Sequence, residues 1–198
     1  MFLFVTKYAD EAETVFQCTQ KGFEDFMIET FYPDAYLDSV HEVDFAAFKA
    51  QGYKAVIFDI DNTLVCHGAP ATPEIILFFE RLRHMGFQIM VMSNNKEPRV
   101  KSFAEAVGGI GYIYKANKPA KSGYMYCMQV MGTKACETLF VGDQLFTDVW
   151  GAKRCDIYSI LVKPIDKKEE FQIILKRYLE RIVLYFYKRS VNASGNKH

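Results

Sequence analysis

One run of residues constrains the fold more than any other. Ala55 to Phe58 is apolar and suited to a strand, and it leads directly into the carboxylates of Asp59 and Asp61. A strand with no polar alternation is typical of parallel sheets that helices cover on both faces. Open sheets of this kind bind ligands beyond the carboxyl ends of their strands. A buried carboxylate is costly unless it is paired or coordinated, so the pattern favours a cation close to these two side chains.

The composition indicates one globular domain with short appendages. The chain has 198 residues, half of them hydrophobic, and its basic and acidic residues balance, so no nucleic-acid partner is expected. The five cysteines show no paired spacing, which favours a reduced, cytoplasmic protein without disulfides. No apolar run approaches the roughly 20 residues that span a bilayer, although peripheral contact with a membrane surface is compatible with the sequence.

Helical and strand-like segments alternate after Asp59. Gly and Pro residues mark their ends. The expected helices are 74–85, 98–107, 122–131 and 146–154, and the expected strands are 88–92, 112–114, 138–141 and 157–162. A helix over 40–51 precedes the first strand. The alternation predicts an α/β, Rossmann-like fold, with a mainly parallel sheet flanked by helices.

The sequence divides into four parts. We expect an N-terminal appendage of unknown role at 1–26, the α/β domain at 27–165, a C-terminal amphipathic helix at 166–189 and a disordered tail at 190–198.

Polar residues follow three of the predicted strands. Because a parallel sheet brings its strand ends to one edge, we expect these residues to surround one ligand. They are Asp59 and Asp61 after the first strand, Ser93 and Asn94 after the second, and Asp143 and Asp148 after the fourth, with Lys118 between the last two groups.

Phosphoryl transfer is the chemistry that requires this combination. Asp59 is the expected nucleophile, and Asp61 the acid and base that serves the leaving group and then water. Ser93, Asn94 and Lys118 are expected to bind the phosphate. Mg²⁺ is the expected cofactor, held by Asp59, Asp143 and a backbone carbonyl near Asp61, with Asp148 holding a metal-bound water.

These segments resemble the four motifs of the haloacid dehalogenase (HAD) superfamily of phosphatases. The residues that carry the resemblance are Asp59-Ile60-Asp61-Asn62-Thr63, Ser93-Asn94-Asn95, Lys118-Pro119 and Gly142-Asp143 with Asp148. More narrowly, they look like subfamily IIIA, which includes the YqeG-type phosphatases and the related phosphatidylglycerophosphate phosphatases. The resemblance implies a Mg²⁺-dependent phosphomonoester hydrolase, and it favours phosphatidylglycerophosphate as the substrate and a role in phospholipid biosynthesis.

The spacing leaves no room for a large cap domain over the site. Each interval, from Asp61 to Ser93 and from Ser93 to Lys118, is filled by one helix and one strand. An open site suits a bulky substrate such as a lipid headgroup. A soluble sugar, nucleotide or protein phosphate is the alternative, and a non-catalytic phosphate-binding module is a third. A calcium loop starting at Asp59 fails, because Leu64 stands where Gly is needed and Pro70 where Glu is needed.

The C-terminal helix is amphipathic and allows two interpretations. Its apolar stripe either docks on the domain or rests on an anionic membrane surface. Glu180 counts against the membrane interpretation. The stripe comprises Phe171, Ile174, Leu175, Tyr178, Ile182, Tyr185 and Phe186.

Overall fold

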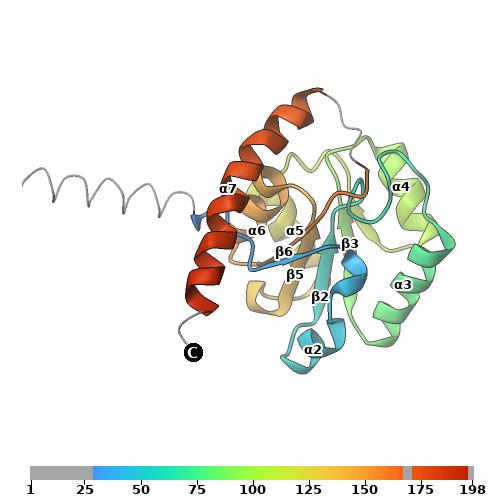
Figure 1. The fold of residues 1–198 in the computed structure, drawn as a ribbon. Coiled ribbons are helices and arrows are strands. Elements are labelled where there is room, and N and C mark those ends of the chain that lie inside the picture. The colour runs from blue at the N-terminus through green and yellow to red at the C-terminus, as the bar shows by residue number, and fades with distance from the viewer. Residues whose placement is uncertain (1–28, 167–170, 196–198) are drawn as a thin grey trace, which may run out of the picture.

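The computed structural model describes residues 29–166 and 171–195 of the chain (Figure 1). The appendage expected at 1–26 lies outside the described residues. The strands are β1 (Ala35–Leu37), β2 (Ala55–Phe58), β3 (Gln88–Met92), β4 (Gly111–Ile113), β5 (Thr138–Gly142) and β6 (Tyr158–Val162). The helices of two turns or more are α3 (Pro73–His84), α4 (Glu97–Ala106), α5 (Lys121–Met131) and α7 (Phe171–Gly195). The shorter helical segments are η1 (Val40–Glu42), α2 (Phe45–Ala50), η2 (Ala135–Glu137), η3 (Leu145–Val149) and α6 (Trp150–Lys153).

The six strands form one sheet in which all pairs are parallel, in the order β1-β6-β5-β2-β3-β4. This confirms the predicted α/β fold with helices on both faces. The chain leaves β2 toward β3 and β4, and later returns to the other side of β2 with β5. The strand order therefore reverses between β2 and β5, which is where open sheets form a ligand crevice.

Side chains alternate between the two faces of the sheet. Val56 and Phe58 of β2 pack under α2, α3 and α4, while Ala55 and Ile57 pack under α5 and α6. All four are fully buried. Because both faces of this strand are covered, its sequence shows no polar alternation.

The predicted helix 74–85 is confirmed as α3, and a side chain caps its start. The Thr72 hydroxyl accepts a hydrogen bond from the Ile75 backbone N–H at 3.2 Å, with Pro73 next along the chain. The residues in the connections from β2 to β4 are all described, and no cap domain is inserted among them.

Two local expectations were wrong, and one strand was not predicted. The helix expected over 40–51 is broken into η1 and α2, because Asp44 interrupts it and accepts a hydrogen bond from the Ala47 N–H. The edge strand β1 was missed; it is held beside β6 by the Asp34 carboxylate, which accepts from the backbone N–H and hydroxyl of Ser159. The helix expected over 146–154 starts instead as the wide, π-helical turn η3.

The C-terminal helix is longer than predicted. Helix α7 continues to Gly195, so residues 190–195 are helical rather than the disordered tail expected from their small, polar composition. Val183 and Leu184 of α7 pack against a buried cluster of Leu145, Val149 and Leu161. The helix therefore lies on η3 and β6, on the α5 and α6 side of the sheet (Figure 1).

The cap of α3 can be tested by Thr72→Ala. We expect this variant to lower the free energy of unfolding by about 1 kcal/mol, because the Ile75 N–H loses its acceptor. Urea unfolding measures the change. Thr72→Ser is the matched control, since it retains the hydroxyl; equal losses in both variants would contradict the capping role.

Candidate active site

The strand ends bring the predicted residues together at the β2–β5 boundary. Phe58 of β2 lies opposite Val141 of β5, and the Asp59 N–H continues the ladder by donating to the Val141 carbonyl at 2.9 Å. Asp59 and Asp143 thus follow adjacent strands at the same edge. Their proximity is a consequence of sheet register, which the sequence pattern alone does not specify.

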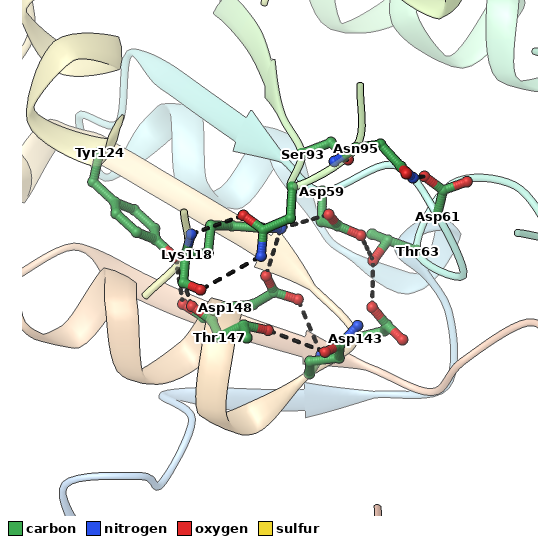
Figure 2. A network of polar contacts seen from close by, with 12 residues as sticks. Asp59, Asp61, Thr63, Ser93, Asn95, Lys118, Tyr124, Asp143, Thr147 and Asp148 are labelled. Atoms are coloured by element: carbon green, nitrogen blue, oxygen red, sulfur yellow. Dashed lines mark hydrogen bonds and ion pairs between the residues drawn. The ribbon is translucent and has the colours of Figure 1, made fainter. Parts of the chain in front are cut away.

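A lysine ammonium lies between two buried carboxylates. The Lys118 Nζ is 2.5 Å from Asp59 Oδ1 and 2.7 Å from Asp148 Oδ1 (Figure 2). All three residues are buried, with Asp148 only 1% exposed. Lys118 therefore neutralises part of the negative charge in a region that water reaches poorly.

Burial and charge shift the pKa values of this group in opposite directions. Burial raises the pKa of Asp59, Lys118 opposes that rise, and the charge of Asp148 adds to it. Burial lowers the pKa of Lys118, but the charges of Asp148 and Asp59 outweigh this effect and raise it above its ordinary value. Lys118 is accordingly a permanent cation, whereas a negative charge on Asp59 needs further positive charge nearby.

Three carboxylates form a group suited to a metal ion. Oxygen atoms of Asp59, Asp143 and Asp148 all lie within 4.8 Å of one another. The Thr63 hydroxyl is 3.2 Å from Asp59 Oδ2 and 3.3 Å from Asp143 Oδ1, and its single proton can serve only one of them at a time. Oxygen ligands crowded in this way are the donor set that Mg²⁺ prefers.

The balance of charges at this edge of the sheet also favours a bound divalent metal ion. Four carboxylates meet two basic side chains at this edge, which leaves a net charge of about minus two for a divalent ion to neutralise. The carboxylates are those of Asp59, Asp61, Asp143 and Asp148, and the basic side chains are Lys118 and Arg99. The residues present fit a divalent metal.

Asp61 lies apart from this group. Its carboxylate accepts a hydrogen bond from the Asn95 amide at 2.8 Å (Figure 2). It also accepts from the Gly68 N–H at 2.8 Å and pairs with Arg99 at 3.1 Å. Burial alone would raise the pKa of Asp61, but the Gly68 N–H and Arg99 outweigh it and hold the pKa below its usual range. The Asp61 side chain is not part of the three-carboxylate group, and the ligand expected at this position is a backbone carbonyl.

The side chains of Ser93 and Asn94 make different contacts. The Ser93 hydroxyl accepts from the Asn95 N–H at 3.1 Å, so its own proton is available to donate into the pocket. The Asn94 amide instead holds the backbone of Lys118: its oxygen accepts from the Lys118 N–H at 2.8 Å, and its nitrogen donates to the Lys118 carbonyl at 3.4 Å. Asn94 was expected to contact phosphate, and its side chain is placed to position the lysine.

These side chains open into one pocket of about 190 Å³. Its lining comprises Asp59, Asp61, Asn62, His67, Ser93, Asn94, Asn95, Lys118, Gln144 and Thr147. Sequence reasoning missed His67, Asn95, Gln144 and Thr147. Two of them carried a signal, because Asn95 directly follows the Ser93-Asn94 pair and Gln144 directly follows Asp143.

The η3 turn shapes one wall of the pocket. Asp148 Oδ2 accepts from the Gln144 N–H at 3.0 Å, and the buried Tyr124 hydroxyl donates to the Thr147 carbonyl at 2.8 Å. A Cβ on Gly142 would lie 2.5 Å from the Asp148 carboxylate. The small residue at the end of β5 thus permits the close approach of Asp148 to the strand.

Glu180 of α7 is a further residue that sequence reasoning misjudged. It was counted against contact of the helix with a membrane, but it is 4% exposed and its carboxylate accepts from the Leu145 N–H at 2.8 Å. Leu145 begins η3, two residues after Asp143. The C-terminal helix therefore holds the turn that carries part of the site.

The known proteins that resemble this chain are hydrolases and phosphatases. Residues 66–156 match the family of haloacid dehalogenase-like hydrolases. The probable phosphatase YqeG of Bacillus subtilis is 37% identical over 160 residues, which cover 80% of this chain and 92% of that protein. The chloroplastic/mitochondrial phosphatidylglycerophosphate phosphatase 1 of Arabidopsis thaliana is 26% identical, over 79% of this chain and 47% of that protein. Among solved structures, a putative subfamily III A hydrolase from Legionella pneumophila is 17% identical, covers 60% of this chain and 70% of its own, and gives a TM-score of 0.48.

The role of Glu180 in holding η3 can be tested by Glu180→Ala. We expect a loss of about 1–3 kcal/mol in the free energy of unfolding, because the Leu145 N–H is left buried without an acceptor. We also expect weaker Mg²⁺ binding, since Asp143 and Asp148 flank that contact. Urea unfolding and Mg²⁺ titration followed by the fluorescence of Trp150, the single tryptophan, measure the two effects. Glu180→Gln keeps an acceptor oxygen and is the control; identical behaviour of the two variants would exclude this role.

Proposed function

The chain belongs to the haloacid dehalogenase-like hydrolases, and on that premise we propose that it hydrolyses phosphomonoesters through an aspartyl-phosphate on Asp59, with Mg²⁺ as cofactor. One observation carries the proposal. The buried Lys118 ammonium pairs with the carboxylates of Asp59 and Asp148, and Asp143 completes the group of three carboxylates. Asp59 and Lys118 line the same pocket as Ser93. A site that only binds phosphate needs the Lys118 ammonium and the Ser93 hydroxyl. The Asp59 carboxylate would weaken such binding, because it repels the phosphate anion.

Covalent catalysis begins at Asp59. A carboxylate oxygen of Asp59 attacks phosphorus and expels the alcohol, which divides one difficult displacement into two easier steps. Lys118 and the Ser93 hydroxyl donate to the phosphate oxygens as charge moves onto them. Asp59, Asp143 and Asp148 would hold Mg²⁺, which would supply positive charge that allows two anions to approach.

Asp61 provides the proton transfers. It protonates the departing alcohol and then takes a proton from the water that cleaves the aspartyl-phosphate, a contribution of roughly 10²–10⁴-fold in general acid–base catalysis. In the structure Asp61 is held by Gly68, Asn95 and Arg99, which keep its pKa low. Its side chain therefore has to leave at least part of this set and take up a proton from solvent before it can protonate the alcohol.

The proposed substrate is phosphatidylglycerophosphate, in phospholipid biosynthesis. Two findings support it. Two relatives are phosphatidylglycerophosphate phosphatases, from Arabidopsis and Chlamydomonas, and the described residues place no cap domain over the pocket to exclude a bulky alcohol. The chain spans about half the length of those two relatives.

Asp59→Asn tests the covalent mechanism. We expect turnover of p-nitrophenyl phosphate to fall by about three orders of magnitude or more, because an amide does not attack phosphorus. The fold should be retained, since asparagine has the same shape and still accepts from Lys118. Phosphate release and thermal unfolding measure both. Asp38→Asn, at an exposed carboxylate that pairs with Lys163, is the matched control. Retained turnover in Asp59→Asn would rule out the aspartyl-phosphate.

A substrate panel tests the lipid assignment. We expect Mg²⁺-dependent phosphate release to be faster for phosphatidylglycerophosphate in mixed micelles than for glycerol 3-phosphate, sugar phosphates or nucleotides at equal concentration. The same reactions with EDTA and with Asp59→Asn provide the background. A preference for a soluble ester would keep the mechanism and discard the lipid, and no turnover of any substrate would favour the phosphate-binding module.

A further inference from the structure

Helix α7 presents a second apolar face that points away from the domain. Five large hydrophobic side chains on this face are between 41% and 63% exposed: Tyr178, Leu179, Ile182, Tyr185 and Phe186. Their spacing places them on one side of the helix, opposite the buried Glu180 and the packed Leu184. The stripe predicted from sequence is thus real, but its described members do not dock on the domain.

The charged residues of the helix are almost all basic. Between Phe171 and Gly195, Glu180 is the sole acidic residue, against five basic ones. Glu180 is buried and bonded to the Leu145 N–H, so it contributes little to the outer surface. Arg181 and Arg189 are exposed among the apolar residues. The outer face therefore combines tyrosine, aliphatic and basic groups with no exposed carboxylate between positions 178 and 192.

This combination matches the boundary of an anionic lipid bilayer. Aliphatic and aromatic groups enter the headgroup region, tyrosine keeps its hydroxyl in water, and basic side chains pair with lipid phosphates. No helix in the described part of the chain is long and apolar enough to cross a membrane. A face of this kind lies on a bilayer rather than spanning it.

The inner face connects the helix to the catalytic pocket. Glu180 and Leu184 hold η3, and Gln144 and Thr147, at the start and within that turn, line the pocket. A membrane bound to the outer face would therefore lie on the side of α7 opposite the turn that lines the pocket.

We propose that the outer face of α7, formed by Tyr178, Leu179, Arg181, Ile182, Tyr185, Phe186 and Arg189, is a docking surface for anionic lipid membranes. The proposal deepens the proposed function, on which it rests for the identity of the substrate, since it places the enzyme on the surface where a phospholipid phosphate resides. The docking itself needs no catalysis.

The test is flotation of the full-length protein with vesicles of phosphatidylcholine alone and with added phosphatidylglycerol. We expect binding to the anionic vesicles only, weakened by salt, because surface charges are screened within about 8–10 Å at physiological ionic strength. Arg181→Gln with Arg189→Gln should reduce partitioning about 25-fold, at roughly fivefold for each basic side chain. Ile182→Gln with Tyr185→Gln should reduce it about tenfold or more.

Matched controls separate docking from folding and from hydrolysis. Leu77 of α3 and Val130 of α5 are as exposed as the α7 residues, at 59% and 55%, and Leu77→Gln with Val130→Gln should bind vesicles like the wild type. Thermal unfolding and Mg²⁺-dependent hydrolysis of p-nitrophenyl phosphate without vesicles should be unchanged in all three double variants. Docking that survives the α7 substitutions would overturn the proposal.

Two further outcomes would also overturn it. Failure of the wild type to float with anionic vesicles, with hydrolysis of p-nitrophenyl phosphate retained, refutes docking and leaves the enzyme intact. Light scattering could show a dimer that the α7 substitutions dissociate, which assigns the face to a second copy of the chain. If vesicle binding follows the predicted pattern but no phosphomonoester is hydrolysed, the docking stands and the proposed function fails.

Discussion

The placement of Lys118 between Asp59 and Asp148 is the interaction on which the site depends. Buried like charges repel strongly, and a single buried ammonium partly compensates them. The structure fixes that ammonium from two directions. Asn94 holds the backbone of Lys118 through two hydrogen bonds, and the opposing carboxylates keep its pKa high. The remaining negative charge makes the arrangement suited to a divalent ion.

The η3 turn links this charge cluster to the rest of the fold. It carries Asp148, it lines the pocket with Thr147, and it is held by Tyr124 on one side and Glu180 on the other. A wide turn leaves more backbone groups to satisfy than a regular helix does, and these two buried side chains supply partners for them. The long C-terminal helix is therefore part of the structural support of the active site.

Helix α7 shows how one amphipathic sequence can serve two surfaces. Its inner face uses a carboxylate and two aliphatic residues to bind the domain, and its outer face keeps aromatic and basic residues exposed. Glu180 illustrates the consequence. On the outer face it would repel an anionic lipid surface, but buried against Leu145 it stabilises the domain instead.

The sequence by itself determined the fold class, the strand that carries Asp59 and Asp61, and the set of catalytic candidates, because periodicity, glycine and proline positions and strand-end carboxylates are local signals. It could not determine the contacts between distant segments. The separation of Asp61 from the metal group, the turn of Asn94 toward Lys118, the added strand β1 and the burial of Glu180 depend on sheet register and helix packing. These features depend on tertiary structure, because each of them joins residues that are far apart in the sequence. The local sequence around one residue does not show which distant residue it will contact.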